Sequence, residues 1–361
     1  MLADSKDNLT DLLDRYAGSK VPGLQYVIVD AVESLFEYAG GWADIQNQNP
    51  MTMNTTMMGY SMTKVFTAGA ILQLVEQGKL DLNDEMDHYL GDTPYAGNHI
   101  TIHQLLDHTS GIPNPIPLRW VHLAEEHPSF NEGSALTKVL HDHPKLAFEP
   151  GQKFAYSNIG YWLLGRIIER ATGQSYPDYV RVNVINQLGL SSQEMDFTIP
   201  DSTRHAKGYL AKYSLTNLLK GFVTDSKFWG GYEGNWLRLK SHYPNGPSFG
   251  GLVGTARSFT SFLQDQLQTE PVLFNQETRR LLETQQKNKD GQPIPMTLGW
   301  HIGETNGSTY LFKEGGGGGF HSEMRIYPGK GFASIVMANS TTFNATNCLN
   351  QMDGAFLSAS S

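Results

Sequence analysis

GYSMTKVFTAGAILQLVEQG (59–78) is the stretch of sequence that most strongly indicates the fold. Its apolar residues recur with helical spacing from Ser61 to Gln77, and Gly78 marks the expected end of the helix. Residues three apart share a helix face, so the Ser61 hydroxyl and the Lys64 amine can approach each other. A serine becomes a nucleophile when a neighbouring base takes its proton, and a lysine can do so when burial keeps it partly neutral. The pair predicts acyl transfer, although a capping serine beside a solvated lysine fits the pair alone equally well.

Two other short segments could complete such a site. Tyr156 and Asn158 lie just before a predicted helix, where a phenol could shuttle a proton and an amide could donate to a substrate carbonyl. Lys313 ends a predicted strand and runs into the glycines 315–319, which would let a substrate approach the backbone closely. Each segment alone is better explained without function, as a core tyrosine beside a helix cap and as a glycine-rich turn with a surface lysine.

Strand-forming runs occupy both ends of the chain. LQYVIVD (24–30) and SLFEYAGGWAD (34–44) predict a hairpin, and further strands are predicted at 297–304, 309–315, 322–328 and 332–339. Besides 61–77, helices are expected at 1–20, 102–106, 136–140, 160–171, 176–187, 258–267 and 346–358. Residues 205–245 show no clear period and are interpreted as loop.

This order of elements predicts an α/β (α+β) fold. One antiparallel sheet would be assembled from both chain ends and flanked by helices, with a mostly helical lobe inserted between them. We expect a single catalytic domain over residues 1–361, with an α/β lobe at about 1–58 and 246–361 and a helical lobe at about 59–245.

Composition excludes several classes of function. The 361 residues carry a net charge of −9, without the basic footprint that a nucleic-acid binder needs. Cys348 is the only cysteine, so neither an intrachain disulfide nor a cysteine-rich metal site is expected. No apolar run is long enough to span a bilayer, and the first 20 residues lack the apolar core of a signal peptide. A cytoplasmic location fits the sequence as given, and a periplasmic or secreted one would follow if a signal peptide had been removed.

Taken together, the three segments resemble the superfamily of class C serine β-lactamases, D-alanyl-D-alanine carboxypeptidases and family VIII-type esterases. The resemblance covers nearly the whole chain, through 59–86, ITIHQLLDHTSGIP (100–113), 148–176, Leu188-Gly189-Leu190, GGLVGTARSFTSFL (250–263), LGW (298–300) and KEGGGGGFHSEMRIYP (313–328). Gly318-Gly319-Phe320 fixes the register of the last match and places Lys313 at the first position of the K-x-G element.

The resemblance implies a role for each candidate residue. Ser61 would be acylated, Lys64 and Tyr156 would transfer protons, Asn158 would contact the substrate, and Lys313 would tune Tyr156. Gly315 would belong to the substrate-binding K-x-G element, and Gly316 would supply its backbone N–H, with that of Ser61, to the oxyanion. No cofactor or metal is implied. His103, His108 and His301 could act as bases, but packing and capping better explain the first two, and His321 could line the cleft.

Glu314 departs from the family, whose β-lactamases and carboxypeptidases usually carry a threonine or serine there to bind a substrate carboxylate. A glutamate facing the cleft would repel that carboxylate.

We therefore predict an esterase of short- to medium-chain carboxylic esters with weak β-lactamase activity, acting on a small ester or amide. The alternatives are a D-stereospecific peptidase, D,D-carboxypeptidase or penicillin-binding protein, and a non-catalytic assembly or sensing protein. The oligomeric state is left open. The aromatics of 205–245 either line an acyl site or pack against the core (Tyr209, Phe222, Phe228, Trp229, Tyr232 and Trp236).

Overall fold

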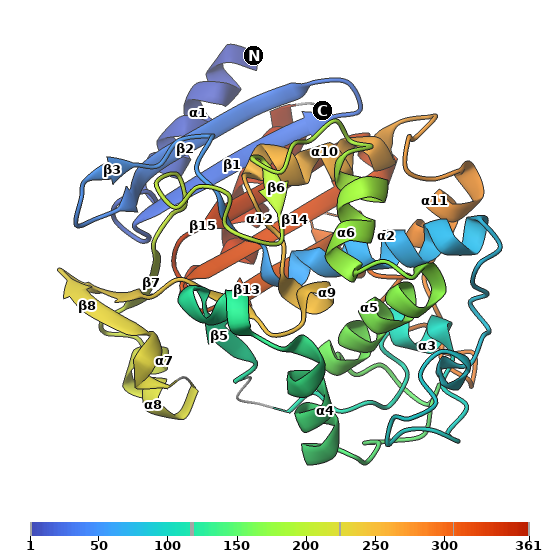
Figure 1. The fold of residues 1–361 in the computed structure, drawn as a ribbon. Helices are drawn as coiled ribbons and strands as arrows, with labels where there is room; N and C mark the ends of the chain where they lie inside the picture. The colour runs from blue at the N-terminus through green and yellow to red at the C-terminus, as the bar shows by residue number, and fades with distance from the viewer. Residues whose placement is uncertain (1, 116–118, 224, 306, 360–361) are drawn as a thin grey trace.

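A seven-stranded antiparallel sheet forms the centre of the protein (Figure 1), which is described by a computed structural model for residues 2–115, 119–223, 225–305 and 307–359. The strand order is β12-β13-β14-β15-β1-β2-β3. The strands are β1 (Gly23–Asp30), β2 (Ser34–Asp44), β3 (Asn49–Pro50), β12 (His301–Thr305), β13 (Ser308–Gly317), β14 (Phe320–Tyr327) and β15 (Phe332–Ala338). β15 pairs with β1, with Leu24 opposite Ala338, so the predicted assembly of one sheet from both chain ends is confirmed.

Helices cover both faces of this sheet. On one face lie α1 (Leu2–Asp14) and α12 (Ala345–Ala359), which contact each other and share a hydrophobic core with β1 and β15. On the other face lies α10 (Ala256–Leu267), which packs on β15 and β1 and is buried along Phe259, Phe262 and Leu263. The larger core continues from this face into the helices of the middle of the chain.

The middle of the chain supplies the helices α2 (Thr63–Glu76), α3 (Ile102–Leu106), α4 (Glu132–Asp142), α5 (Asn158–Thr172), α6 (Tyr176–Val180), α9 (Pro247–Gly250) and α11 (Gln276–Glu283). Helix α2 is apolar on all sides and is buried from Thr63 to Leu74, as expected for a helix enclosed by others. It contacts α5, α6 and α9, which makes it the central helix of this part (Figure 1). None of the described helices is long and apolar enough to cross a membrane.

The loop prediction for residues 205–245 is wrong. This stretch forms a three-stranded sheet of β7 (Gly208–Ala211), β9 (Trp236–Leu239) and β8 (Trp229–Glu233), with the short helices α7 (Leu215–Leu218) and α8 (Lys220–Val223). It also contains β10 (His242–Pro244), which pairs with β5 (Val121–Leu123). The unit projects from one corner of the molecule (Figure 1). Its strands are only three to five residues long, too short to show a clear alternation in the sequence.

Smaller differences concern the ends of elements. The first helix ends at Asp14, six residues before the predicted end at residue 20. Residues 297–300, expected in a strand, form a turn in which the Thr297 N–H donates to the Trp300 carbonyl, and β12 begins at His301. The helix predicted at 176–187 is α6 followed by a π-helical turn, Arg181–Ile185. The two-residue strands β4 (Met57–Met58), β6 (Met195–Asp196) and β11 (Val253–Gly254) were not predicted.

Candidate active site

Ser61 lies in a single 3₁₀ turn, Tyr60–Met62, that leads directly into α2. The predicted helix therefore begins two residues later than expected. Tyr60 has a φ of +43°, a left-handed conformation that a bulky residue rarely adopts. Its hydroxyl donates to the carbonyl of Gly318 at 2.8 Å and lies 3.0 Å from Nε2 of His242. These bonds hold the strained residue in place and present Ser61 at the start of α2.

Lys64 is fully buried, and three oxygen atoms of neighbouring residues surround its amine. Nζ lies 3.0 Å from Ser61 Oγ, 2.7 Å from Asn158 Oδ1 and 2.6 Å from the carbonyl oxygen of Phe249. Two of these partners, the amide oxygen and the carbonyl, can only accept. A neutral amine has two N–H groups for them and one lone pair, which then points at the Ser61 hydroxyl. The geometry thus suits a base that takes the serine proton.

Electrostatics favour that neutral amine. Burial lowers the pKa of Lys64 well below its usual value, and the charge of Lys313 lowers it further. Burial also lowers the pKa of Lys313, to about 7. Both amines lie over the Tyr156 ring, with Nζ of Lys64 4.9 Å and Nζ of Lys313 5.6 Å from its centroid.

Tyr156 donates from its hydroxyl to Ser61 Oγ at 2.7 Å, which confirms the predicted proximity of these two residues. Burial raises the pKa of Tyr156 well above its usual value, an effect that the bond to Ser61 opposes and the charge of Glu314 reinforces. The residue is therefore a neutral phenol in this state, able to give a proton. Its ring packs against two imidazoles, those of His108 and His301, at centroid distances of 4.6 and 6.1 Å.

The histidines considered as bases do not contact Ser61. Nδ1 of His108 accepts from the backbone N–H of Ser157 at 3.2 Å, and burial, with the charges of Lys313, His301 and Lys64, lowers its pKa. His103 bonds to Gln286 at a distance from the site residues. His108 and His301 instead form part of the wall behind Tyr156.

Asn158 begins α5 and lines the same cavity as Ser61. Its amide oxygen accepts from Lys64, and its Nδ2 donates to Asn114 Oδ1 at 3.1 Å. Both ends of the amide are thus engaged within the protein, and Asn158 positions Lys64. Asn114 was not singled out from the sequence, because nothing around it distinguishes a site residue from a loop asparagine.

Strand β13 brings the third segment against the turn that carries Ser61. Lys313 is buried and donates to the carbonyl of Gly299 at 3.0 Å. A Cβ at Gly315 would collide with the Gly59 carbonyl, and one at Gly317 would collide with the Tyr60 ring. The glycines are therefore required by close packing of β13 on the 3₁₀ turn. Gly316 lines the cavity beside Ser61.

Glu314 points away from this site. Successive side chains of a strand face opposite sides, and Glu314 is exposed where Lys313 is buried. Its carboxylate lies 2.5 Å from Nε2 of His321, which is part of a separate shallow pocket with Phe343 and Asn347. The repulsion expected for a glutamate facing the cleft therefore does not apply, and His321 does not line the cavity of Ser61 either.

Ser61 opens into a cavity of about 450 Å³. Its polar lining includes Tyr60, Tyr156 and Asn158, and among the described residues that line it Lys220 is the one lysine, arginine or carboxylate. The apolar walls come from β5, α9, β10 and the 205–245 region, through Trp120, Val121, Leu210, Phe228, Trp229, Leu239, Pro244 and Phe249. Of the predicted aromatics, Phe228 and Trp229 line this cavity, while Tyr209, Tyr232 and Trp236 do not. The side chain of Phe222 lies outside the described part.

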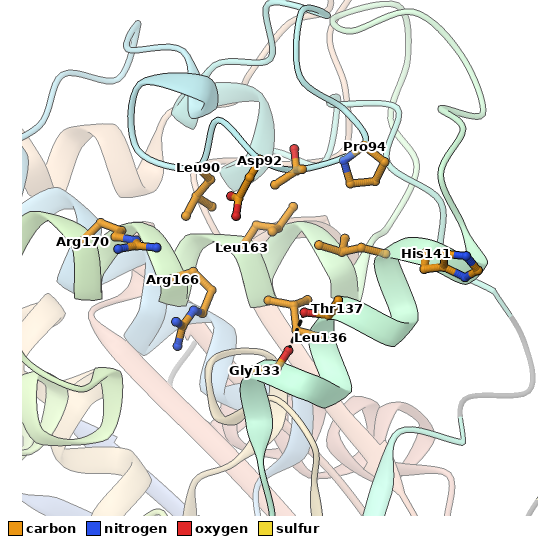
Figure 2. Close-up of a pocket in the computed structure, with 12 residues that line it drawn as sticks. Leu90, Asp92, Pro94, Gly133, Leu136, Thr137, His141, Leu163, Arg166 and Arg170 are labelled. Atoms are coloured by element: carbon orange, nitrogen blue, oxygen red, sulfur yellow. Dashed lines mark hydrogen bonds between the residues drawn. The ribbon is translucent and has the colours of Figure 1, made fainter.

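A second cavity, of about 530 Å³, contains none of the predicted site residues. It lies between α4, the middle of α5 and residues 90–94, where Leu136 and Leu163 form its floor and Arg166 and Arg170 its edge (Figure 2). Among the described residues, no three His, Cys, Asp or Glu side chains gather in a way that could hold a metal ion.

Comparison with known proteins gives consistent matches. The family model described as Beta-lactamase matches residues 9–355. Penicillin-binding protein 4* of Bacillus subtilis (strain 168) is 32% identical over 157 residues, which are 44% of this chain and 34% of that protein. The chain thus matches about a third of the length of this curated relative.

Solved structures show the same fold. The D-amino acid amidase from Ochrobactrum anthropi SV3 superposes with a TM-score of 0.81 at 21% identity, over 100% of both chains. The octameric penicillin-binding protein homologue from Pyrococcus abyssi superposes with a TM-score of 0.78 at 23% identity, over 98% of this chain and 77% of that one. At these identities the match establishes the fold alone.

Proposed function

This chain belongs to the beta-lactamase family of serine hydrolases, and we propose that it hydrolyses carboxylic esters of short to medium acyl chains through an acyl-enzyme on Ser61. One arrangement supports this most directly. Ser61 Oγ, bonded to Lys64 Nζ at 3.0 Å and to the Tyr156 hydroxyl at 2.7 Å, opens into a cavity with mostly apolar walls. Such walls suit a hydrocarbon chain, and Lys220 is the one lysine or arginine among the described residues that line them.

In the proposed reaction, Ser61 Oγ attacks the ester carbonyl while its proton passes to neutral Lys64. The backbone N–H groups of Ser61 and Gly316 would stabilise the oxyanion, each with a contribution of about 3 kcal/mol. Tyr156 would give its proton to the leaving alcohol and recover one through Lys64. Water, activated by the same pair, would then release the acid and restore the Ser61 hydroxyl.

A D-stereospecific peptidase or D,D-carboxypeptidase, the role of a penicillin-binding protein, is the second candidate. It is favoured by the orientation of Glu314, because the described residues that line the cavity include no carboxylate that would repel a substrate carboxylate. Weak β-lactam hydrolysis is compatible with either candidate.

A substrate panel separates these candidates. Rates would be measured for p-nitrophenyl esters of increasing chain length, a chromogenic β-lactam and a D-alanyl dipeptide, with Ser61→Ala as the blank. We expect the highest kcat/KM for the esters. An inert ester series beside a rapidly cleaved dipeptide would establish the peptidase instead.

Whole-protein mass spectrometry after a fluorophosphonate or penicillin challenge tests the third possibility, that the chain is a non-catalytic assembly or sensing protein. We expect an adduct that is lost in Ser61→Ala. The absence of an adduct with either probe, together with no turnover in the panel, would show a non-catalytic member of the family.

A further inference from the structure

Exposed apolar side chains are concentrated on the projecting 205–245 region. Nine large apolar side chains are exposed in the described part of the chain, and five of them form a patch between residues 213 and 232: Tyr213, Leu215, Leu218, Leu219 and Tyr232. Tyr213, Leu215 and Leu218 are 83%, 70% and 79% exposed. Isolated exposed apolar residues need no explanation, but a cluster of this kind marks a contact surface.

Helix α7 and the two residues after it turn one side toward solvent and the other toward the cavity of Ser61. Leu215, Leu218 and Leu219 share the outer side of α7 because they are three and four residues apart. Thr216 and Lys220, also four apart, line the cavity of Ser61. The apolar surface therefore lies on the outside of a wall whose inside forms part of the substrate cavity.

The region is basic in an acidic protein. Residues 207–240 contain six lysines and arginines and two acidic residues, a net charge of +4 in a chain whose net charge is −9. Two of the basic residues form ion pairs. Lys227 pairs with Glu126, which lies outside this stretch, and Arg238 pairs with Glu233 within it. Nζ of Lys212 lies 5.6 Å from the ring centroids of both Tyr213 and Tyr232, at the margin of the patch.

We propose that the 213–232 patch docks on the surface of an anionic lipid assembly, with Leu215 and Leu218 in the acyl layer and Lys212 among the head groups. Apolar side chains beside a lysine combine the two attractions that bind a protein to such an interface. This role rests on the proposed ester hydrolysis, because docking would bring the cavity wall next to acyl chains held in the assembly.

A second copy of this chain fits the patch less well. A two-fold contact places the same surface on both copies, so it would bring the positive charges of the two Lys212 side chains into one interface. A contact with a different surface would need another apolar patch, but the remaining exposed apolar residues of the described chain are Val32, Trp42, Val182 and Val272, far apart in the sequence.

The test is co-sedimentation with vesicles of phosphatidylcholine and phosphatidylglycerol, with Ser61→Ala as the background so that turnover plays no part. We expect binding that weakens with salt and is lost with phosphatidylcholine alone. The double variant Leu215→Ser/Leu218→Ser should bind at least about tenfold more weakly. The control Val182→Ser/Val272→Ser, which changes two exposed residues elsewhere, should bind like the parent.

Activity on a water-dissolved short-chain ester, measured with Ser61 intact, should be equal in the double variant and the parent, since neither leucine lines the cavity. Equal vesicle binding by parent and double variant, or no binding by the parent, would overturn the docking proposal. So would self-association of the parent in sedimentation velocity that the double variant abolishes, since the patch would then join two copies. Because vesicle binding is read without catalysis, an inert enzyme that still binds would refute the esterase proposal alone.

Discussion

Lys64 and Lys313 reach the same tyrosine ring from different elements, one from α2 and the other from β13. Both are fully buried, and their Nζ atoms lie 4.9 and 5.6 Å from the centroid of Tyr156. Burial lowers the pKa of both lysines, and the charge of Lys313 lowers the pKa of Lys64 further.

Substitution of Lys313 by methionine should shift the pH dependence of catalysis. The Lys313 charge is the second cause, after burial, of the lowered pKa of Lys64. Without that charge the pKa of Lys64 rises, so a higher pH is needed to make the amine neutral. We expect the acid limb of kcat/KM to move to higher pH in Lys313→Met, while exposed Lys79→Met leaves it in place. An unchanged acid limb would mean that Lys64 is not the base.

The same substitution should change how stability depends on pH. The pKa of Lys313 is about 7 in the folded protein and about 10.4 in an unfolded chain, so the folded state binds fewer protons between these values. The free energy of unfolding should therefore rise from pH 7 to pH 9 in the wild type and rise less in Lys313→Met. Urea denaturation at the two pH values measures this. If the free energy of unfolding rose equally in the two proteins, the lowered pKa of Lys313 would be contradicted.

Removal of the Tyr60 hydroxyl should loosen the contact between the 3₁₀ turn and β13. Tyr60→Phe leaves the Gly318 carbonyl without that donor and should cost about 1–3 kcal/mol of stability. We also expect kcat to fall about tenfold or more, because Ser61 is no longer held as firmly. Tyr176→Phe, which removes a buried hydroxyl bonded to Thr67, is the control and should lose stability with less loss of rate. If the two substitutions lowered kcat equally, Tyr60 would have no particular role in positioning Ser61.

Glu314→Gln should affect stability more than substrate choice. Burial lowers the pKa of His321, but the bond to Glu314, the charge of Glu314 and the bond to the Phe343 carbonyl together raise it above its usual value, while the bond to His321 lowers the pKa of Glu314. The pair therefore stabilises most between about pH 4.5 and about pH 6.5, and this contribution is lost as the pH rises through the pKa of His321. The melting temperature of the variant should fall more at pH 6 than at pH 9. A large gain in β-lactam hydrolysis would instead show that Glu314 acts on the substrate.

Chain-length preference should respond to the cavity wall. Val121→Phe adds a ring to a residue that lines the cavity, so kcat/KM for an octanoate ester should drop about tenfold while that for an acetate stays nearly constant. Val32→Phe, in the exposed turn between β1 and β2, is the matched control. A uniform loss across all chain lengths would place the acyl chain elsewhere.

The long periodic elements were predictable from the sequence, and the short ones were not. The helices predicted at 61–77 and 258–267 and the hairpin at 24–44 follow from apolar spacing and lie within two residues of the predicted bounds. The sheet of β7, β8 and β9 was missed because each strand has only four or five residues and because β7 pairs with β9, more than 20 residues later in the chain.

At the site, residue types were predictable but orientations were not. Ser61, Lys64 and Tyr156 are brought together as expected, yet nothing local to Asn158 shows that its amide would hold Lys64. The orientation of Glu314 was likewise not predictable, because the bond that holds its carboxylate comes from His321 on the neighbouring strand β14.

The pairing of β15 with β1 also sets an order of events during synthesis. The N-terminal hairpin leaves the ribosome long before its partner strand exists, so its edge stays open until residues 332–338 emerge. Lys313, on β13, is synthesised only shortly before residues 332–338. A nascent chain thus carries Ser61 and Lys64 through most of translation without the strand that completes their surroundings, and we expect the proposed acylation of Ser61 only after the sheet is finished.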